Sequence, residues 1–190
     1  MKLSREKFSP FFPLFLVFLW VSAAQAVDLR TVSHVSDGDT IVLDNREKVR
    51  LIGVDTPEMH DEARNGRDAA RNGLKRQIVH RFAAEAKSFL RDLIEGKQVR
   101  LEYDWERKDK YGRTLAYVFL DSGLLKGTDL KGLSGYEVVT LEERQYVFVN
   151  ATMVSAGYGF AYTRFPFKYL DAFRDHEKQA KSARLGLWGS

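Results

Sequence analysis

The feature that most constrains this chain is a short apolar stretch that ends in a charged turn, residues 50–58 (RLIGVDTPE). Its residues alternate between two faces with a period of two, which indicates a β-strand. Pro57 has no backbone N–H to donate to a sheet, so the strand must end at the turn. The turn then places Asp55 and Glu58 at a strand end, with Arg50 one strand length back. Because buried charges are costly unless they are paired or bound to metal, these three side chains indicate a functional site rather than packing.

A second acidic turn, Asp37-Gly38-Asp39-Thr40, lies just upstream. Asp-Gly between apolar runs is a strong signal for a hairpin. The pattern therefore predicts a three-stranded meander with strands at 29–35, 39–44 and 48–54. Asp37 is interpreted as a plain turn residue. Asp39 and Asp55 together offer hard oxygen ligands for one divalent cation.

The region 59–80 carries five basic residues against three acidic ones, together with two Asn-Gly pairs that break any long helix. We expect a solvated loop here, and the alternative is a basic lip that touches a polyanion. The clearest helix is predicted at 82–95, where apolar residues form one stripe and Gly96 occupies the position of a C-terminal cap.

The remaining elements follow from the same signals. Strands are expected at 98–103 and 113–120, joined by a charged turn. Glycines punctuate residues 121–145, which predicts an elongated hairpin or a surface excursion, and we assign no chemistry to it. A short helix is expected at 150–157 and a longer one at 168–184.

Five strands, with a helix after the third and helices at the C-terminus, indicate an α+β fold. We expect a five-stranded Greek-key β-barrel of the OB type with about three α-helices. A chain of 190 residues with 44% apolar residues is sufficient for one domain with a real core. The sequence contains no internal repeat and no sign of a second domain, so residues 27–190 are expected to form one unit.

Residues 1–26 have the composition of a signal peptide. A basic beginning precedes an almost wholly apolar run at 11–21, and Ala24-Gln25-Ala26 has the form of a cleavage site. The alternative is an uncleaved membrane anchor, but the only apolar window of about 20 residues contains Pro10 and Pro13. We therefore expect cleavage after Ala26 and a periplasmic or secreted protein, with retention at a membrane as the lesser alternative.

Charge and metal-binding residue types limit the possible partners. The signal segment carries three basic residues against one acidic residue, so the net charge of +4 falls to +2 without it, which permits a nucleic-acid partner but does not require one. The chain has no cysteine, which excludes disulfides, thiolate metal sites and a cysteine nucleophile. His60 lies among acidic residues, but a lone histidine is a weak metal signal, and His176 is expected in the core. Asn150-Ala151-Thr152 matches a glycosylation sequon, for which we favour a structural role.

Four motifs in a fixed order carry a family resemblance. They are Asp37-Gly38-Asp39-Thr40, residues 50–58, Asp109-Lys110-Tyr111-Gly112-Arg113 and Leu185-Gly186-Leu187-Trp188. Each motif is weak by itself, but in this order, with a helix between the second and third, the chain resembles the thermonuclease family, the staphylococcal-nuclease-like nucleases. The resemblance covers nearly all of the chain after residue 26.

The resemblance implies a fold, a reaction and a metal. Members of the family have an OB barrel with three helices, and they cleave phosphodiester bonds of DNA and RNA with calcium, leaving 3′-phosphate ends. In the family pattern, Asp39 and Asp55 would be calcium ligands, with the backbone carbonyl of Thr56 as a third. Glu58 would be the general base on the attacking water. A monomer is expected.

The resemblance also implies which residues bind the substrate. Arg50 and Arg113 would hold the phosphate, and Lys110 and Tyr111 would line the nucleotide site. The family has an aromatic residue that stacks on a base before the last helix. For that role Tyr162 is our first choice, with Phe165 as the second.

Elementary chemistry makes this division of roles reasonable. A phosphodiester is anionic, so attack by hydroxide requires that its charge be neutralised, and a calcium ion with two guanidinium groups can do this. The main alternative is an OB module that binds nucleic acid without cutting it, because folds of this kind serve many functions. The pattern favours the nuclease, because a binding module has no need for all five of its charged residues together, which are Asp39, Arg50, Asp55, Glu58 and Arg113.

Overall fold

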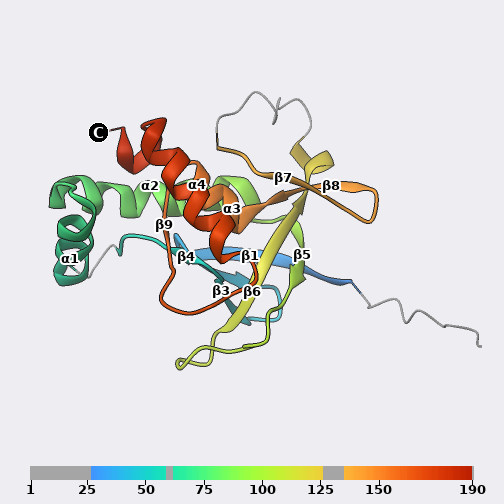
Figure 1. Cartoon of the computed structure of the whole chain (residues 1–190). Helices are drawn as coiled ribbons and strands as arrows, with labels where there is room; N and C mark the ends of the chain where they lie inside the picture. Colours follow the sequence, from blue (N-terminus) through green and yellow to red (C-terminus); the bar gives the residue numbers. More distant parts are fainter. Residues whose placement is uncertain (1–26, 59–61, 126–134, 190) are drawn as a thin grey trace, which may run out of the picture.

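The structure is a computed structural model that describes residues 27–58, 62–125 and 135–189 (Figure 1). The predicted signal segment and His60 lie outside the described residues. Within those residues, no helix combines the length and the apolar character that a membrane crossing requires.

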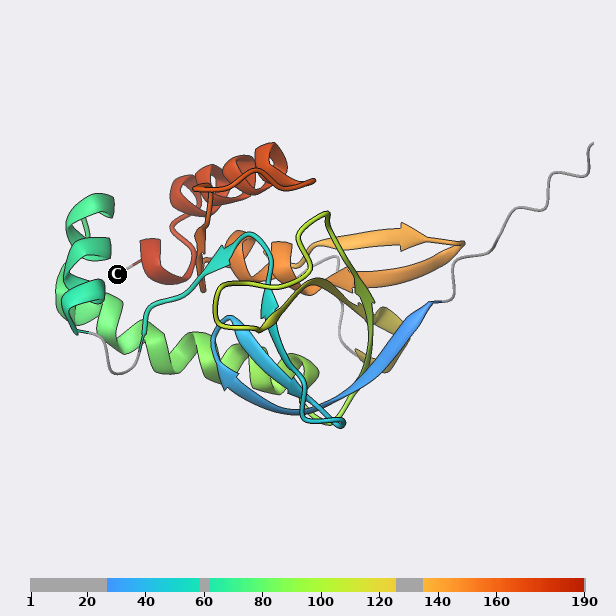
Figure 2. The same cartoon turned by 90° about the horizontal axis from the view of Figure 1, so that it is seen from below.

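Five strands form the closed barrel that the sequence predicts. They are β1 (Asp28–Asp37), β2 (Thr40–Leu43), β3 (Lys48–Leu51), β5 (Gln98–Glu102) and β6 (Thr114–Asp121). Neighbours in the order β3-β2-β1-β5-β6 pair antiparallel, and a parallel pairing of β3 with β6 closes the ring. The strands curve around a common interior in Figure 2. The predicted five-stranded OB-type barrel is therefore confirmed.

Strand β1 makes the closure possible because it belongs to two halves of the barrel. Its first residues, 28–31, pair with β5, and residues 32–37 pair with β2. Two irregularities interrupt the register with β2, and such bulges increase the bend and twist of a strand. The interior of the barrel is filled by fully buried apolar side chains, including Val32, Ile41, Val49, Ala116 and Leu120.

The third predicted strand, 48–54, is divided in two. Strand β3 ends at Leu51, and β4 (Val54–Asp55) pairs instead with β9 (Phe160–Ala161). Gly53 lies between them with a φ of +78°, and a Cβ atom there would come within 2.8 Å of the rings of Phe167 and Phe173. The bend therefore requires glycine, and it turns the chain out of the barrel just before Asp55.

The prediction of a loop at 59–80 is wrong. Helix α1 (Glu62–Asn72) occupies much of this region, and α2 (Arg76–Ile94) begins well before residue 82. Gly73 separates the two helices with a φ of +67°, as its Asn-Gly pair indicates, whereas the pair at 65–66 lies inside α1. Tertiary contacts of α1 override the low helix propensity of that pair, as the site shows below.

Helix α2 runs from α1 to the barrel, where its later part packs, and it buries one apolar stripe, as predicted (Figure 2). Its Leu90 and Ile94 are fully buried in the main core, and Gly96 follows with a φ of +74°. Two further helices, α3 (Val149–Ser155) and α4 (Leu170–Ser182), cover another side of the barrel (Figure 1). The described residues thus contain four α-helices where the sequence predicts about three, and the additional one is α1.

The predicted hairpin or excursion at 121–145 contains a hairpin. Strands β7 (Val138–Leu141) and β8 (Arg144–Phe148) pair with each other, and β8 adds to the outer part of β6. Short 3-10 turns, η1 (Ser122–Leu125) and η2 (Gly186–Trp188), complete the elements. Residues 126–134 of the predicted excursion lie outside the described part of the chain.

Candidate active site

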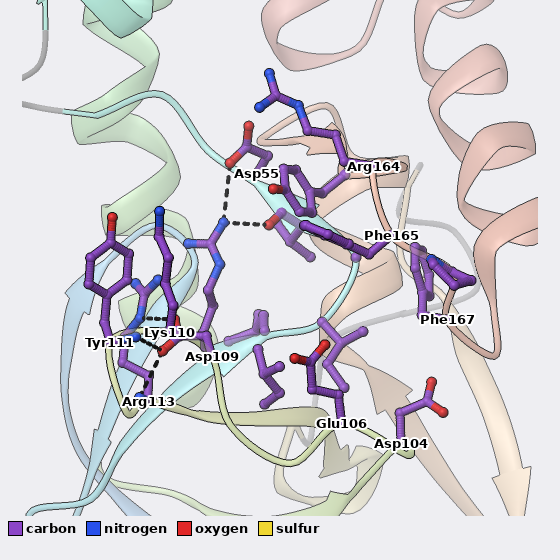
Figure 3. Close-up of a pocket in the computed structure, with 18 of the residues that line it drawn as sticks. Asp55, Asp104, Glu106, Asp109, Lys110, Tyr111, Arg113, Arg164, Phe165 and Phe167 are labelled. Carbon is purple, nitrogen blue, oxygen red and sulfur yellow. Dashed lines mark hydrogen bonds and ion pairs between the residues drawn. The ribbon is translucent and has the colours of Figure 1, made fainter.

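A cleft of about 1000 Å³ opens beside the barrel (Figure 3). Four parts of the chain line it: the β3–β4 bend, the loop 104–113 between β5 and β6, the segment 162–167 after β9, and helix α1. Ligand pockets in proteins usually measure about 300–1,000 Å³, so this cleft has room for more than one small group.

Arg50 joins the two predicted acidic turns at one edge of this cleft. Its Nη1 donates to Asp39 Oδ2 at 2.5 Å, and its Nη2 donates to Asp55 Oδ1 at 3.2 Å and to the carbonyl oxygen of Val54 at 3.2 Å. The side chains of Asp39 and Asp55 are only 2% and 9% exposed. Two buried carboxylates from different turns therefore converge on one guanidinium.

Thr56 lies against the same acidic turn. A Cβ atom on Gly38 would come within 2.8 Å of Thr56 Oγ1, so the Asp37–Thr40 turn can approach this threonine only because it contains glycine. Thr56 is 1% exposed. The three residues that the sequence predicts as calcium ligands, Asp39, Asp55 and Thr56, are thus brought together.

Arg113 is held by Asp109, a residue to which the sequence assigns no role of its own. Arg113 Nε donates to Asp109 Oδ2 at 2.7 Å, and the backbone N–H groups of Arg113 and Tyr111 both donate to Asp109 Oδ1 at 2.9 Å. Burial of the Asp109 carboxyl acts to raise its pKa, but these hydrogen bonds outweigh burial and the pKa is lowered. Asp109 therefore stays charged and fixes the turn that carries Arg113.

Thr40 links the two arginines. Its Oγ1 donates to Asp39 Oδ1 at 2.8 Å and accepts a hydrogen bond from Arg113 Nη1 at 3.3 Å. A continuous chain of polar contacts thus runs from Arg113 through Thr40 and Asp39 to Arg50. The sequence places Thr40 in a motif but does not predict this connection, because the two arginines lie far apart along the chain.

Glu58 also lines the cleft, and helix α1 holds its backbone. The Glu58 N–H donates to Asn65 Oδ1 at 2.9 Å, and Asn65 Nδ2 donates to the Glu58 carbonyl oxygen at 2.5 Å. Asn65 is 1% exposed. A single buried amide therefore satisfies both backbone groups of Glu58, which explains why helix α1 forms in spite of its Asn-Gly pair.

Two tyrosines accompany the two arginines. The ring of Tyr111 lies 5.6 Å from Arg113 Cζ and 4.9 Å from Lys110 Nζ. The ring of Tyr162 lies 6.0 Å from Arg50 Cζ, and its backbone N–H donates to the carbonyl oxygen of Gly53 at 2.9 Å. The predicted substrate residues Lys110, Tyr111 and Tyr162 thus line the same cleft as the predicted phosphate-binding arginines.

Helix α1 contributes two further cations that the sequence analysis leaves in a loop. Arg67 and Arg71 are exposed and line the cleft. They are four residues apart, so they share one face of the helix. The favoured interpretation of this region as a solvated loop missed them, whereas the alternative basic lip describes their position.

The donors at the acidic turns fit a hard cation. Asp39 and Asp55 supply two carboxylates, and the backbone carbonyl of Thr56 can supply a third oxygen, which is the ligand type that calcium takes. Throughout the described ranges, no group of three or more His, Cys, Asp or Glu is placed to hold a metal ion. A cation at this site would therefore depend on carbonyl and water oxygens in addition to the two carboxylates.

Two residues that the sequence analysis sets aside lie away from the cleft. His176 Nδ1 lies 3.2 Å from Glu137 Oε1, and the proximity of His176 lowers the pKa of that carboxyl. Asn150 is fully buried and donates to the carbonyl oxygens of Ile52 and Ala116 at 3.0 and 3.1 Å. These contacts confirm the structural role that the sequence predicts for Asn150.

Comparisons with known proteins show which family the chain resembles. Residues 48–190 match the family model described as "Staphylococcal nuclease homologue". The chain is 45% identical over 92 residues to a protein of Staphylococcus intermedius named "Thermonuclease", an alignment that covers 47% of each chain.

Two longer alignments extend the likeness. A "Thermonuclease" of Staphylococcus hyicus is 29% identical over 84% of this chain and 75% of its own length. A "Micrococcal nuclease" of Shigella flexneri is 32% identical over 90% of this chain and 80% of its own. The chain thus spans about half of the first of these three relatives and three quarters or more of the other two.

Proposed function

Because the chain belongs to the staphylococcal nuclease family, we propose that it is a calcium-dependent endonuclease that hydrolyses phosphodiester bonds in DNA and RNA. The observation that carries this proposal is the chain of contacts from Arg113 through Thr40 and Asp39 to Arg50, with Glu58 lining the same cleft. A phosphate between the two arginines would lie within reach of a carboxylate that can act on water.

The two arginines would bind and polarise the phosphate. A guanidinium is always charged and presents its donors in a fixed fork, which suits the oxygens of a phosphate. Asp109 orients Arg113, while Asp39 and Asp55 orient Arg50, so neither side chain has to reorganise as negative charge builds on the phosphate in the transition state. A calcium ion held by Asp39, Asp55 and the Thr56 carbonyl would add positive charge at the same phosphate.

Glu58 would act as the general base. Its carboxylate takes a proton from a water molecule, the resulting hydroxide attacks phosphorus, and the bond from phosphorus to the 5′-oxygen of the next nucleotide breaks. The departing 5′-oxygen takes a proton from solvent and leaves as an alcohol, Glu58 returns its proton to solvent, and the phosphate stays on the 3′-oxygen. The contact of Asn65 with the Glu58 backbone supports this role because it fixes the chain from which the carboxylate projects.

The alternative is a nucleic-acid-binding module without catalysis. It would account for the arginines and the tyrosines of the cleft, but it would leave two buried carboxylates, Asp39 and Asp55, with no role beyond orienting one guanidinium, that of Arg50. Buried carboxylates repel a phosphate unless a cation lies between them, so their position favours a metal-assisted reaction.

The test uses the two carboxylates. We expect Asp39→Ala and Asp55→Ala each to weaken calcium binding, measured by titration calorimetry, and to abolish cutting of single-stranded DNA while the chain stays folded. Wild-type cutting that persists in excess chelator, or unchanged calcium affinity in both variants, would reject the metal assignment.

We also propose that the protein is exported with cleavage after Ala26, and that it acts as a monomer. The motivation for export is the composition of residues 1–26. Mass spectrometry of the exported fraction should find Val27 as the first residue, and sedimentation should give the mass of one chain. An intact Met1 in membrane pellets would favour the membrane-anchored alternative.

A further inference from the structure

The exposed aromatic side chains of the described residues all line one cleft. Trp105, Tyr111 and Phe165 are 65%, 72% and 62% exposed, and in residues 27–58, 62–125 and 135–189 they are the aromatic residues with such exposure. All three line the cleft. Large apolar surfaces that face water in one group indicate a binding surface.

Trp105 and Phe165 come from different segments, and one carboxylate ties these segments together. Asp104 accepts hydrogen bonds from the backbone N–H of Trp105 at 2.9 Å and from the backbone N–H of Lys168 at 2.8 Å. Asp104 also accepts a hydrogen bond from the hydroxyl of Tyr117, which is buried in the core. The loop that carries Trp105 is therefore anchored both to the barrel and to the segment that carries Phe165.

The side of the cleft that carries Phe165 also carries carboxylates. In Figure 3, Lys110, Tyr111 and Arg113 lie on one side, whereas Phe165 and Phe167 lie on the other, with Asp104 and Glu106 below them and Arg164 above Phe165. Carboxylates disfavour a phosphate backbone, but they leave the flat face of a base free to stack. The ring of Phe165 also lies 6.1 Å from that of Tyr162, so aromatic surface extends outward from the ring beside Arg50.

We propose that Trp105 and Phe165 form a second base-binding subsite, which takes an unpaired base of the substrate strand beyond the nucleotides held at Arg50, Arg113 and Tyr111. The proposal rests on the proposed nuclease function for its ligand, single-stranded nucleic acid. Stacking of a base on an aromatic ring tolerates any sequence because each base has a π-face. A paired base within a duplex has both faces covered by its neighbours, so the subsite selects unpaired substrate.

Binding to oligonucleotides of two lengths tests the subsite. Titrations use Glu58→Gln protein with calcium at fixed salt, so that the ligand stays intact and phosphate contacts are constant. Stacking of one base corresponds to a loss of about 5- to 150-fold on substitution by alanine. We therefore expect Trp105→Ala to weaken an octathymidylate by a factor in this range and to leave a dinucleotide unchanged. Phe165→Ala should act in the same direction.

Three comparisons separate stacking from other effects. Trp105→Phe keeps an aromatic face and should recover most of the affinity for the octamer. Leu124→Ala removes a side chain that is 52% exposed and lies outside the cleft lining, and it should change nothing. With an octamer that is abasic beyond its first two nucleotides, Trp105→Ala should cost no further affinity.

Intrinsic fluorescence adds a direct readout. The octamer should quench the emission of Trp105, and the quenching should be absent in Trp105→Phe. Equal octamer affinities for the protein with intact Trp105 and Trp105→Ala would overturn the proposal while leaving the nuclease function standing. A change in sedimentation of Trp105→Ala without a change in DNA affinity would also overturn it, because the aromatics would then be a protein contact. If the wild-type chain binds but never cuts, the length dependence still decides the subsite.

Discussion

The two walls of the cleft are built in different ways. On the barrel wall, Arg50 is part of strand β3 and Arg113 is held by Asp109 four residues away, so neighbouring strands and a tight turn fix both arginines. On the helical wall, Glu58 follows the short strand β4, and a single amide, that of Asn65, binds its backbone. The pairing register of the sheet sets the geometry of the barrel wall, whereas the helical wall depends on the contact between Asn65 and Glu58.

Burial follows the same division. Asp39 is almost fully buried, and Asp109 makes three hydrogen bonds within its own turn. In helix α1, by contrast, the described side chains that are buried are only Asn65 and Ala69. A helix with so little buried surface gains little stability from packing, so its position is the easier one to disturb. We therefore expect substitutions in α1 to disturb the position of Glu58 while they leave Arg50 and Arg113 in place.

The largest expected effect comes from the base itself. Glu58→Gln removes proton abstraction and keeps the shape of the side chain, and loss of a general base typically costs about 10²–10⁴ in rate. Binding of single-stranded DNA at fixed salt with calcium should stay close to that of wild type. Single-turnover cleavage beside a binding titration measures both quantities. Arg113→Ala is the contrast from the barrel wall, and it should lose affinity as well as rate. A wild-type rate in Glu58→Gln would assign the base to another group.

The next effect tests the contact that holds the helical wall. Asn65→Ala leaves the backbone N–H and carbonyl of Glu58 without their partner, and displacement of a reacting group by about 1 Å can cost about 10² in rate. We expect kcat to fall by about 10- to 100-fold with little change in the affinity for DNA. Asn65→Asp keeps an acceptor for the Glu58 N–H and should recover part of kcat. Equal losses of kcat and of thermal stability in both variants would indicate a purely structural role for Asn65.

A smaller effect concerns the barrel wall, where loss of the Asp109 contacts should lower the stability of the fold. The pKa of Asp109 is lowered in the folded chain, so its contribution is present above its unfolded pKa of about 3.9 and is lost as the pH falls through the folded pKa. Hydrogen bonds to charged groups contribute about 1.5–3 kcal/mol, so Asp109→Ala should lower the free energy of unfolding by about that amount at pH 7. Denaturant unfolding at several pH values measures it. A difference between wild type and variant that stays constant down to pH 2 would contradict this account.

The smallest effect concerns the exposed arginines of α1. Removal of each phosphate contact with a single strand lowers the slope of log affinity against log salt by about 0.7. We expect the double variant Arg67→Ser and Arg71→Ser to bind DNA more weakly, with a shallower salt dependence and little change in kcat. Arg81→Ser is the matched control, because Arg81 is an exposed arginine of α2 that does not line the cleft. If the double variant and Arg81→Ser have equal salt slopes, the arginines of α1 are not part of the binding surface.

The sequence predicts the barrel wall well because its signals are local. Asp-Gly at residues 37–38 marks a hairpin, and residues 50–58 alternate and then end at a proline, so both turns can be placed without knowledge of the tertiary structure. The order of the motifs along the chain supplies the family. The predictions that fail here are small, such as the division of the third strand at Gly53, which depends on the packing of Phe167 and Phe173.

The helical wall could not be predicted in the same way. The Asn-Gly pair at 65–66 has a low helix propensity. The hydrogen bonds between Asn65 and the Glu58 backbone offset it, and they form only in the folded chain. Trp105 was missed for a related reason. A tryptophan in a charged turn has no period that marks its role, and its place in the same cleft lining as Phe165 appears only when the chain is folded.

The most direct test of the whole account is the fate of end-labelled single-stranded DNA incubated with the protein in calcium and in excess chelator, with analysis of the new ends. We expect cutting with calcium, none in chelator, and 3′-phosphate ends. Tight binding without cutting under any divalent metal would contradict the account and leave a nucleic-acid-binding barrel in its place.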